Sequence, residues 1–229
     1  MRFYYSADWT MKHLHEPNIL LSFGTIYNKG TIRKTEISRR CRSLFLDNGA
    51  YSMRLGDYPF EAFYDWVYSL LPHLPVDYVA TVDRFGDMET TIKFTEKCMS
   101  DNPKIPWLPV VQGASVKEYV DCCKDYIDTG IVEDHIAVGG LKGMSKHLKR
   151  RVLNSILDEM GHLEIHGFGI NLMDLRDPVI YHSLTSADSA SWKRRPQTNE
   201  EKYNNLEIFK RDLKNIQELH ASQQTLEVS

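Results

Sequence analysis

The sequence predicts an α/β protein built as a (β/α)8 TIM-type barrel, somewhat trimmed and followed by a C-terminal helix. Short β-rich runs alternate with segments of helical periodicity roughly every 30 residues, as in the repeating units of a parallel barrel. The runs LFL, YVATV, WLPVV and IAV are apolar throughout, which is typical of strands buried on both faces. No Gly-x-Gly-x-x-Gly motif opens a helix, which disfavours the doubly wound sheet that is the alternative.

The chain has 229 residues, a length that α/β folds commonly occupy as one domain. We expect a single barrel domain over residues 1–222 and a frayed tail over residues 223–229.

The first half of the chain carries the clearest apolar patterns. The expected elements are strand 19–26, strand 43–46, helix 59–73, strand 77–82 and helix 87–99. Helix 59–73 has a proline in its first turn and an apolar stripe from Phe60 to Leu70.

The second half is marked by helix start and stop signals. The expected elements are strand 107–111, helix 115–128, strand 135–138, helix 145–160, strand 163–165, a short helix 177–182, strand 184–187 and a long polar helix 199–221. Ser115 is placed as an N-cap, and Gly130 and Gly161 end the helices that precede them.

Polar residues and glycines follow the carboxyl end of one expected strand after another. They are Asp47, Asp83, Gln112, Gly140, His166 and Asp188. The carboxyl ends of the strands form the catalytic face of a parallel barrel, so these residues are expected to share one mouth.

This set of residues suits a planar heterocycle such as guanine. Gln112 offers a donor and an acceptor, and the backbone at Gly139 and Gly140 lets a ligand approach closely. Tyr51 and His166 can stack on the two faces of the ring. Two further carboxylates suit chemistry at a glycosidic carbon, one as nucleophile and one moving protons on the base.

Each residue also has an ordinary structural interpretation. Asp47 in DNGAY suits a turn, Asp83 can pair with Arg84 or cap a helix, and Asp188 can cap a short turn. Gln112 and the glycine pair are common loop residues, and His166 suits a hydrogen-bonded core position. The joint arrangement is what favours a site.

Five segments, in order, resemble motifs of the tRNA-guanine transglycosylases. They are LFLDNGAYS, VVQG, VGGL, HGFG and SADSASW, and together they span roughly residues 44–192. The last of them is more similar to the small phage and bacterial relatives, the DpdA-like branch, that insert 7-deazaguanines into DNA.

The resemblance implies a role for each matching residue. Asp188 would be the nucleophile at C1′ and Asp47 the general acid and base. Asp83 would read the N1/N2 edge of the base, while Gln112 and the Gly140 amide would read O6. The remaining members of the implied base pocket are Gly139, the Leu141 carbonyl, Gly167, and Tyr51 and His166 on either side of the ring. His166 stands where the family usually has Met.

The chain departs from the tRNA enzymes after the last motif. Their C-x-C-x2-C…H zinc site has no counterpart, because no cysteine follows Trp192. Their P-T-R segment is also missing. We therefore expect no metal, no cofactor and no zinc subdomain, and DNA rather than tRNA as the polymer substrate.

Basic segments are the candidate surface for nucleic acid. They cover residues 33–42, 142–151 and 193–195, and the expected contacts are Lys146, Arg150, Trp192, Lys193, Arg194 and Arg195. A solvated face is the ordinary interpretation of a charge run, and a core position is the alternative for Trp192.

Composition limits the remaining classes. A net charge of −3 argues against a uniformly basic coat, and the apolar runs are too short to span a bilayer. Without a signal peptide, and with Cys41, Cys98, Cys122 and Cys123 taken as reduced thiols, a cytoplasmic location in a bacterial or phage-infected cell is expected.

The leading hypothesis is a transglycosylase that exchanges guanine in DNA for a free 7-deazaguanine base, preQ0 or a relative, through a covalent glycosyl–aspartate. The alternatives are a tRNA-guanine transglycosylase, a hydrolase or ribosyltransferase acting on a free nucleoside, and a non-catalytic subunit that binds nucleic acid. The oligomeric state stays open.

Overall fold

The computed structural model describes residues 1–7, 16–27, 41–53, 57–193 and 198–227. Two expected nucleic-acid contacts, Arg194 and Arg195, lie outside this part of the chain, as does most of the first basic segment.

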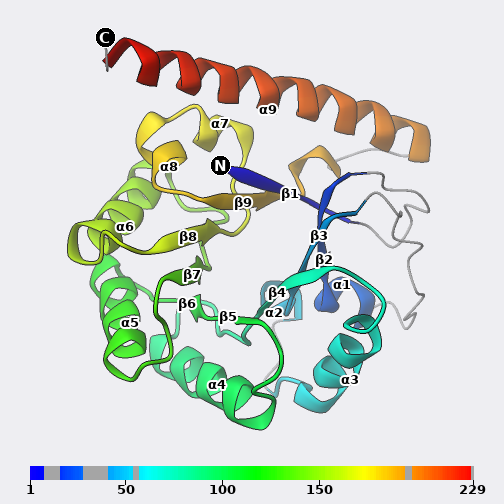
Figure 1. Cartoon of the computed structure of the whole chain (residues 1–229), viewed down its shortest axis with the longest axis vertical. Coiled ribbons are helices and arrows are strands. Elements are labelled where there is room, and N and C mark those ends of the chain that lie inside the picture. Colours follow the sequence, from blue (N-terminus) through cyan, green and yellow to red (C-terminus); the bar gives the residue numbers. More distant parts are fainter. Residues whose placement is uncertain (8–15, 28–40, 54–56, 194–197, 228–229) are drawn as a thin grey trace.

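Parallel strands form a barrel with helices on its outside (Figure 1). The strand order is β5-β4-β3-β2-β1-β9-β8-β7-β6, and every pair is parallel. The strands are β1 Arg2–Ser6, β2 Asn18–Ser22, β3 Ser43–Asp47, β4 Val76–Ala80, β5 Trp107–Leu108, β6 Val110–Val111, β7 His135–Val138, β8 Glu164–Gly167 and β9 Ser186–Ser189. The predicted (β/α)8 class is confirmed.

The barrel closes where Pro109 separates β5 from β6. β5 pairs with β4, and β6 pairs with β7. Proline has no N–H to donate to a ladder, so the strand is split at this residue. The Pro109 carbonyl still accepts a hydrogen bond from the Ala137 amide at 2.9 Å. The nine segments therefore occupy eight positions around the barrel.

The helices follow the strands in the expected alternation. They are α1 Phe23–Tyr27, α2 Ala50–Met53, α3 Phe60–Leu70, α4 Met88–Asp101, α5 Val116–Asp128, α6 Lys146–Glu159, α7 Leu172–Leu175, α8 Pro178–His182 and α9 Asn199–Glu227, with a 3-10 turn η1 at Ser191–Lys193. Asp87, Ser115 and Ser145 cap α4, α5 and α6 by accepting hydrogen bonds from first-turn amides.

The expected strand over residues 19–26 is wrong in its second half. β2 ends at Ser22 and α1 begins at Phe23. Gly24 passes close to Gly49, where an added Cβ would lie 2.1 Å from the Gly24 amide nitrogen. Gly49 also has a φ of +74°, so the loop after β3 can cross the start of α1 only with glycine at this position.

Most other boundaries differ from the expectation by one to three residues, and three differences are larger or involve the site. β1 at Arg2–Ser6 was not anticipated, β9 begins at Ser186 and includes Asp188, and α9 continues to Glu227 beyond the expected end at residue 221. β1 matters most, because it lies between β2 and β9 and completes the barrel.

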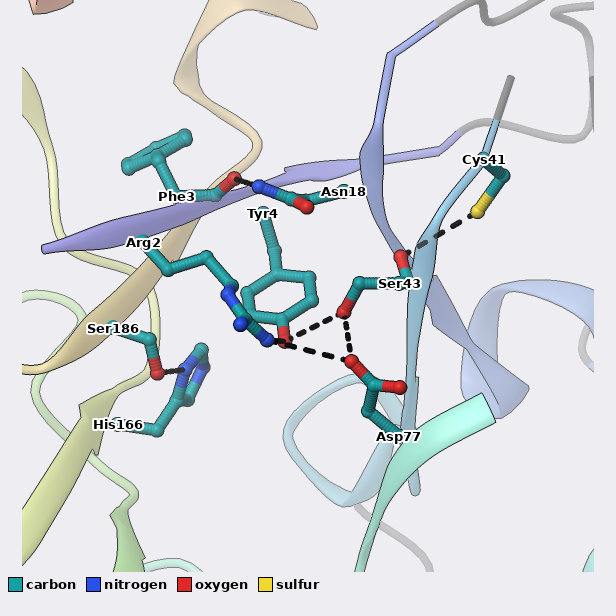
Figure 2. A network of polar contacts seen from close by, with 9 residues as sticks. All are labelled: Arg2, Phe3, Tyr4, Asn18, Cys41, Ser43, Asp77, His166 and Ser186. Atoms are coloured by element: carbon teal, nitrogen blue, oxygen red, sulfur yellow. Dashed lines mark hydrogen bonds and ion pairs between the residues drawn. The ribbon is translucent and has the colours of Figure 1, made fainter. Parts of the chain in front are cut away.

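The barrel interior is filled by side chains that alternate along the strands. The buried apolar layer consists of Tyr4, Leu20, Phe45, Ala80, Leu108, Val110 and Ala137. Below it, Tyr4 Oη and Ser43 Oγ lie 2.9 Å apart, and Ser43 and Arg2 both contact Asp77 (Figure 2). This polar network lies at the amino-terminal end of the barrel, opposite the carboxyl ends of the strands.

Helix α9 lies along the outside of the barrel, next to α7 and β1 (Figure 1). It buries an apolar stripe of Leu206, Phe209, Leu213 and Ile216, at helical spacing. Among the described helices, none combines the length and apolar character that crossing a bilayer requires.

Candidate active site

A cavity of about 470 Å³ opens at the carboxyl ends of the strands. It brings together eight of the residues expected from the sequence: Tyr51, Asp47, Asp83, Gln112, Gly139, Gly140, Asp188 and Lys193. These residues come from β3, β9, α2, η1 and the loops after β4, β6 and β7. Of the six strand-end residues expected to share one mouth, all but His166 line the cavity.

Asp188 is held at the seam between β9 and β1. Its Oδ2 accepts a hydrogen bond from the Ser6 hydroxyl at 2.9 Å, and its Oδ1 accepts one from the Gly169 amide at 2.8 Å. The carboxylate is nearly buried, with a side-chain exposure of 9%. Two neutral donors on opposite oxygens fix its orientation without a counter-ion.

Asp47 lies at the end of β3, in the same cavity. Burial raises the pKa of this carboxyl to about 7, and repulsion from Asp188 and Asp83 adds to the effect. Hydrogen bonds from Ser22 and the Gly49 amide oppose the rise. A carboxyl group with this pKa can give and take a proton near neutral pH.

Asp83 is bound on both of its oxygens by amides. Asn48 Nδ2 donates to Oδ1 at 2.8 Å, and Gln112 Nε2 donates to Oδ2. Burial raises the pKa of Asp83, and these two hydrogen bonds work against the rise. The Asp83–Gln112 pair presents acceptor and donor groups side by side, which is the pattern that a base edge requires.

Gly139 and Gly140 lie so close to the Gln112 side chain that neither position has room for a Cβ atom. A Cβ on Gly139 would lie 2.3 Å from Gln112 Nε2, and one on Gly140 would lie 2.8 Å from Gln112 Oε1. Gly140 also has a φ of +71°. The glycines therefore let the loop after β7 close over the Gln112 amide, in addition to allowing a ligand to approach.

Aromatic rings surround the mouth of the cavity. Tyr51 and Phe85 are 41% and 58% exposed and meet edge to face, with ring centroids 5.9 Å apart. Phe168 also lines the cavity. His166 does not, because its ring is fully buried beneath Phe168, with centroids 4.8 Å apart. The expected stacking face at His166 is therefore wrong, and the ring that lines the cavity is that of Phe168, two residues later.

Three other expected residues do not line the cavity. Leu141 is fully buried, and its carbonyl accepts a hydrogen bond from the Met144 amide at 3.1 Å. An added Cβ on Gly167 would meet Ile170 and Leu184, so this glycine faces the outer core. Trp192 is 4% exposed and packs in the same core, which corrects its expected contact with nucleic acid in favour of the core alternative.

The basic residues divide into two groups. Lys142 and Lys193 line the cavity: Lys142 Nζ lies 4.5 Å from the Tyr51 ring centroid, and Lys193 Nζ donates to the Ala7 carbonyl at 3.1 Å. Lys146 and Arg150 are exposed on α6 without lining the cavity, and Arg150 lies 3.8 Å from Asp177.

Several cavity residues were not among the site residues expected from the sequence. Ser6, Asn48, Lys142, Phe168 and Gly169 support or line the site. Phe168 and Gly169 belong to the HGFG segment already singled out, so that motif held the only available signal for them. Within the described ranges, no three His, Cys, Asp or Glu side chains are grouped as they would be around a metal ion.

The fold and the cavity together define a parallel α/β barrel with three carboxylates at the carboxyl ends of its strands, where barrel enzymes have their active sites. Residues 73–203 match the family model of DpdA, described as DeoxyPurine in DNA protein A. The match covers more than half of the chain, so the protein belongs to the DpdA family. It includes Asp83, Gln112 and Asp188, while Asp47 precedes it. No curated protein was found to match the chain.

Proposed function

We propose that this protein is a DNA-modifying transglycosylase that replaces guanine in DNA with a free 7-deazaguanine base. The observation that carries the proposal is the pairing of two carboxylates in one cavity: Asp188, fixed by Ser6 and Gly169, and Asp47, whose pKa is raised to about 7. Membership of the DpdA family supports DNA as the polymer.

In the first step, an oxygen of Asp188 attacks C1′ of the target deoxyguanosine. The C1′–N9 bond breaks, its electron pair stays with the departing guanine, and the protonated Asp47 supplies a proton to that base. The product is a glycosyl ester on Asp188, and Asp47 becomes ionised.

In the second step, N9 of the incoming 7-deazaguanine attacks C1′. Asp47 takes the N9 proton, the ester C–O bond breaks, and its electron pair returns to the Asp188 carboxylate. Both carboxyl groups regain their starting states. A pKa near 7 suits Asp47 to both directions of proton transfer at neutral pH.

The Asp83–Gln112 pair and the Gly140 amide supply base recognition. Asp83 accepts from the N1–H and exocyclic amine of guanine, and Gln112 and Gly140 donate to O6. Asn48 keeps Asp83 in place by donating to its other oxygen. Both guanine and a 7-deazaguanine carry this edge, as an exchange reaction requires.

Stacking involves Tyr51 on one side and Phe168 on the other, with Phe85 beside Tyr51 at the rim. A base reaches this cavity only after it leaves the duplex stack, which costs a few kcal/mol. Lys142 and Lys193 at the rim are placed to contact the phosphates on either side of the displaced nucleotide.

The test is base incorporation. The protein is incubated with labelled preQ0 in four separate reactions. Each reaction contains one acceptor: duplex DNA, single-stranded DNA, tRNA or free deoxyguanosine. Label in DNA with release of guanine supports the proposal. Label in tRNA alone, or hydrolysis of the free nucleoside without a polymer, contradicts it. Asp188→Asn is the matched control, because Asn keeps the size of the side chain and loses the nucleophile.

A further inference from the structure

The His166 ring lies directly behind Asp188, outside the cavity. It is fully buried among three rings. Tyr4 and Phe168 meet it edge to face and Phe45 is tilted against it, with centroids 5.9, 4.8 and 4.5 Å away. These three rings fix the plane of the imidazole. The buried ring cannot stack on a ligand in the cavity. Its two nitrogens are buried polar groups, and such groups ordinarily have hydrogen-bond partners.

Among the described residues, one of the two nitrogens has a hydrogen-bond partner and the other has none. Nδ1 lies 2.9 Å from the Ser186 hydroxyl, which is drawn in Figure 2. Nε2 is buried without a partner within hydrogen-bond distance, and it lies 3.7 Å from Asp188 Oδ1. The unpaired nitrogen therefore faces the carboxylate to which the proposed function assigns the nucleophile.

We propose that His166 is a positioning residue for Asp188, a neutral imidazole whose Nε2–H is aimed at Oδ1 and donates to it as the carboxylate shifts during the reaction. The inference rests on the proposed function. Ser186 donates its hydroxyl proton to Nδ1, which leaves the ring proton on Nε2. Such hydrogen bonds are often long before the substrate binds and tighten in the reacting complex.

The surroundings favour the neutral ring. The titratable groups near it are Asp188 on β9, Tyr4 on β1 and His135 on β7. Burial lowers the pKa of His166 below its ordinary value, and Asp188 opposes that shift without reversing it. A neutral donor stabilises the carboxylate without neutralising it, whereas an imidazolium would pair with it and weaken it as a nucleophile.

The hydrogen bond from His166 to Asp188 matters most in the second step of the proposed reaction. When the ester bond breaks, its electron pair returns to the Asp188 carboxylate, and negative charge reappears at Oδ1. Gly169 N–H and His166 Nε2–H are both aimed at that oxygen. The proton stays on Nε2 throughout, so His166 lowers the barrier by hydrogen bonding and takes no part in proton transfer.

The kinetic test separates positioning from packing. His166→Phe keeps a ring among Tyr4, Phe45 and Phe168 and removes the donor, whereas His166→Gln keeps an N–H at a similar reach. In single-turnover assays, formation and resolution of the ester are timed separately. We expect His166→Phe to slow resolution about 10- to 100-fold, the effect of one hydrogen bond to a charged group, with KM for the base unchanged and with partial recovery in His166→Gln.

The outcomes distinguish this inference from the function on which it rests. An inactive wild-type protein overturns the proposed function. An active wild type with equal resolution rates in wild type and His166→Phe overturns the role of His166 alone. If His166→Phe fails to fold, nitrogen-15 NMR of the labelled wild-type imidazole decides. A neutral ring protonated on Nε2 supports the inference, and one protonated on Nδ1 overturns it.

Discussion

The Ser6 hydroxyl donates a hydrogen bond to the Asp188 carboxylate across 2.9 Å, although the two residues are 182 positions apart in the chain. β1 lies beside β9 with Tyr4 opposite Asp188. The pairing of β1 with β9 therefore also brings the Ser6 hydroxyl to Asp188 and orients the carboxylate of the proposed nucleophile.

Asp47 is expected to make both stability and activity depend on pH. Because its pKa in the folded chain is about 7, above the ordinary 3.8, the folded state holds an extra proton between these values. The free energy of unfolding therefore falls as the pH rises through this window. The shift corresponds to a penalty of about 4 kcal/mol at pH 8. Asp47→Asn removes this penalty, so Tm at pH 8 should rise by roughly 8–16 °C, while base exchange should fall roughly 10²- to 10⁴-fold.

Thermal unfolding at about pH 4 and pH 8, beside the exchange assay, checks both parts of the Asp47 prediction. The difference in Tm should nearly vanish at the lower pH, because residue 47 of the folded state is then uncharged in both proteins. Asp65→Asn, an exposed position on α3, serves as the control. A lower Tm for Asp47→Asn at pH 8 would contradict the assigned pKa.

Gly139→Ala is expected to damage base recognition. The new Cβ would lie 2.3 Å from Gln112 Nε2 and 3.3 Å from Asp83 Oδ2, which forces the recognition pair apart. We expect KM for the 7-deazaguanine to rise about tenfold or more, the effect of one or two lost hydrogen bonds. Gly161→Ala, in the loop after α6, is the control. Unchanged KM in Gly139→Ala would remove Gln112 from base recognition.

Lys142→Ala is expected to weaken DNA binding through lost phosphate contact. Lys142 is exposed at the rim of the cavity, with its Nζ over the Tyr51 ring. The affinity should fall for every DNA sequence, and the slope of log affinity against log salt should become shallower by about one. Lys104→Ala, which precedes β5 at the opposite end of the barrel, should leave both quantities as they are. An unchanged slope in Lys142→Ala would place the phosphates elsewhere.

The buried ion pair between Lys149 and Asp174 is expected to support the loop after β8. Their side chains are 3% and 7% exposed, and Asp174 also accepts a hydrogen bond from the Asn171 amide, in the loop that carries Gly169. Lys149→Met leaves a buried carboxylate unpaired and should lower the free energy of unfolding by about 3–5 kcal/mol. The double variant Lys149→Met/Asp174→Asn should recover most of the loss in denaturant titrations. A double variant as unstable as the single one would refute the pairing.

Much of the fold was predictable because apolar runs and helix caps are local signals. Strand 135–138 was placed correctly, and Asp87, Ser115 and Ser145 cap the helices that follow them. β1 was missed because its five residues, RFYYS, form a short run with no turn signal to bound it. The end of β2 was missed because Gly24 turns the chain only through its contact with Gly49, which is distant in sequence.

The candidate site was predictable to the extent that strand ends define it. Asp47, Asp83, Gln112 and Asp188 were found because each ends or follows a strand, and parallel strands bring such residues together. The sequence could not show that Phe168 lines the cavity and that His166 is buried behind it, because both residues stand in one short segment. Strand alternation puts residues 166 and 168 on the same side of the chain, so what separates them is height in the barrel: His166 lies within β8, and Phe168, after the strand end, lies nearer the mouth.

The proposed reaction passes through a sugar–aspartate ester on Asp188, and intact mass measurement of rapidly denatured protein detects such an ester. Mixing the enzyme with a guanine-containing oligonucleotide, without added 7-deazaguanine, should give a covalent adduct of oligonucleotide minus guanine. Peptide mapping should place this adduct on Asp188, it should disappear when the base is added, and it should be absent in Asp188→Asn. An adduct mapped to another residue, or base exchange that proceeds in Asp188→Asn, would contradict the account.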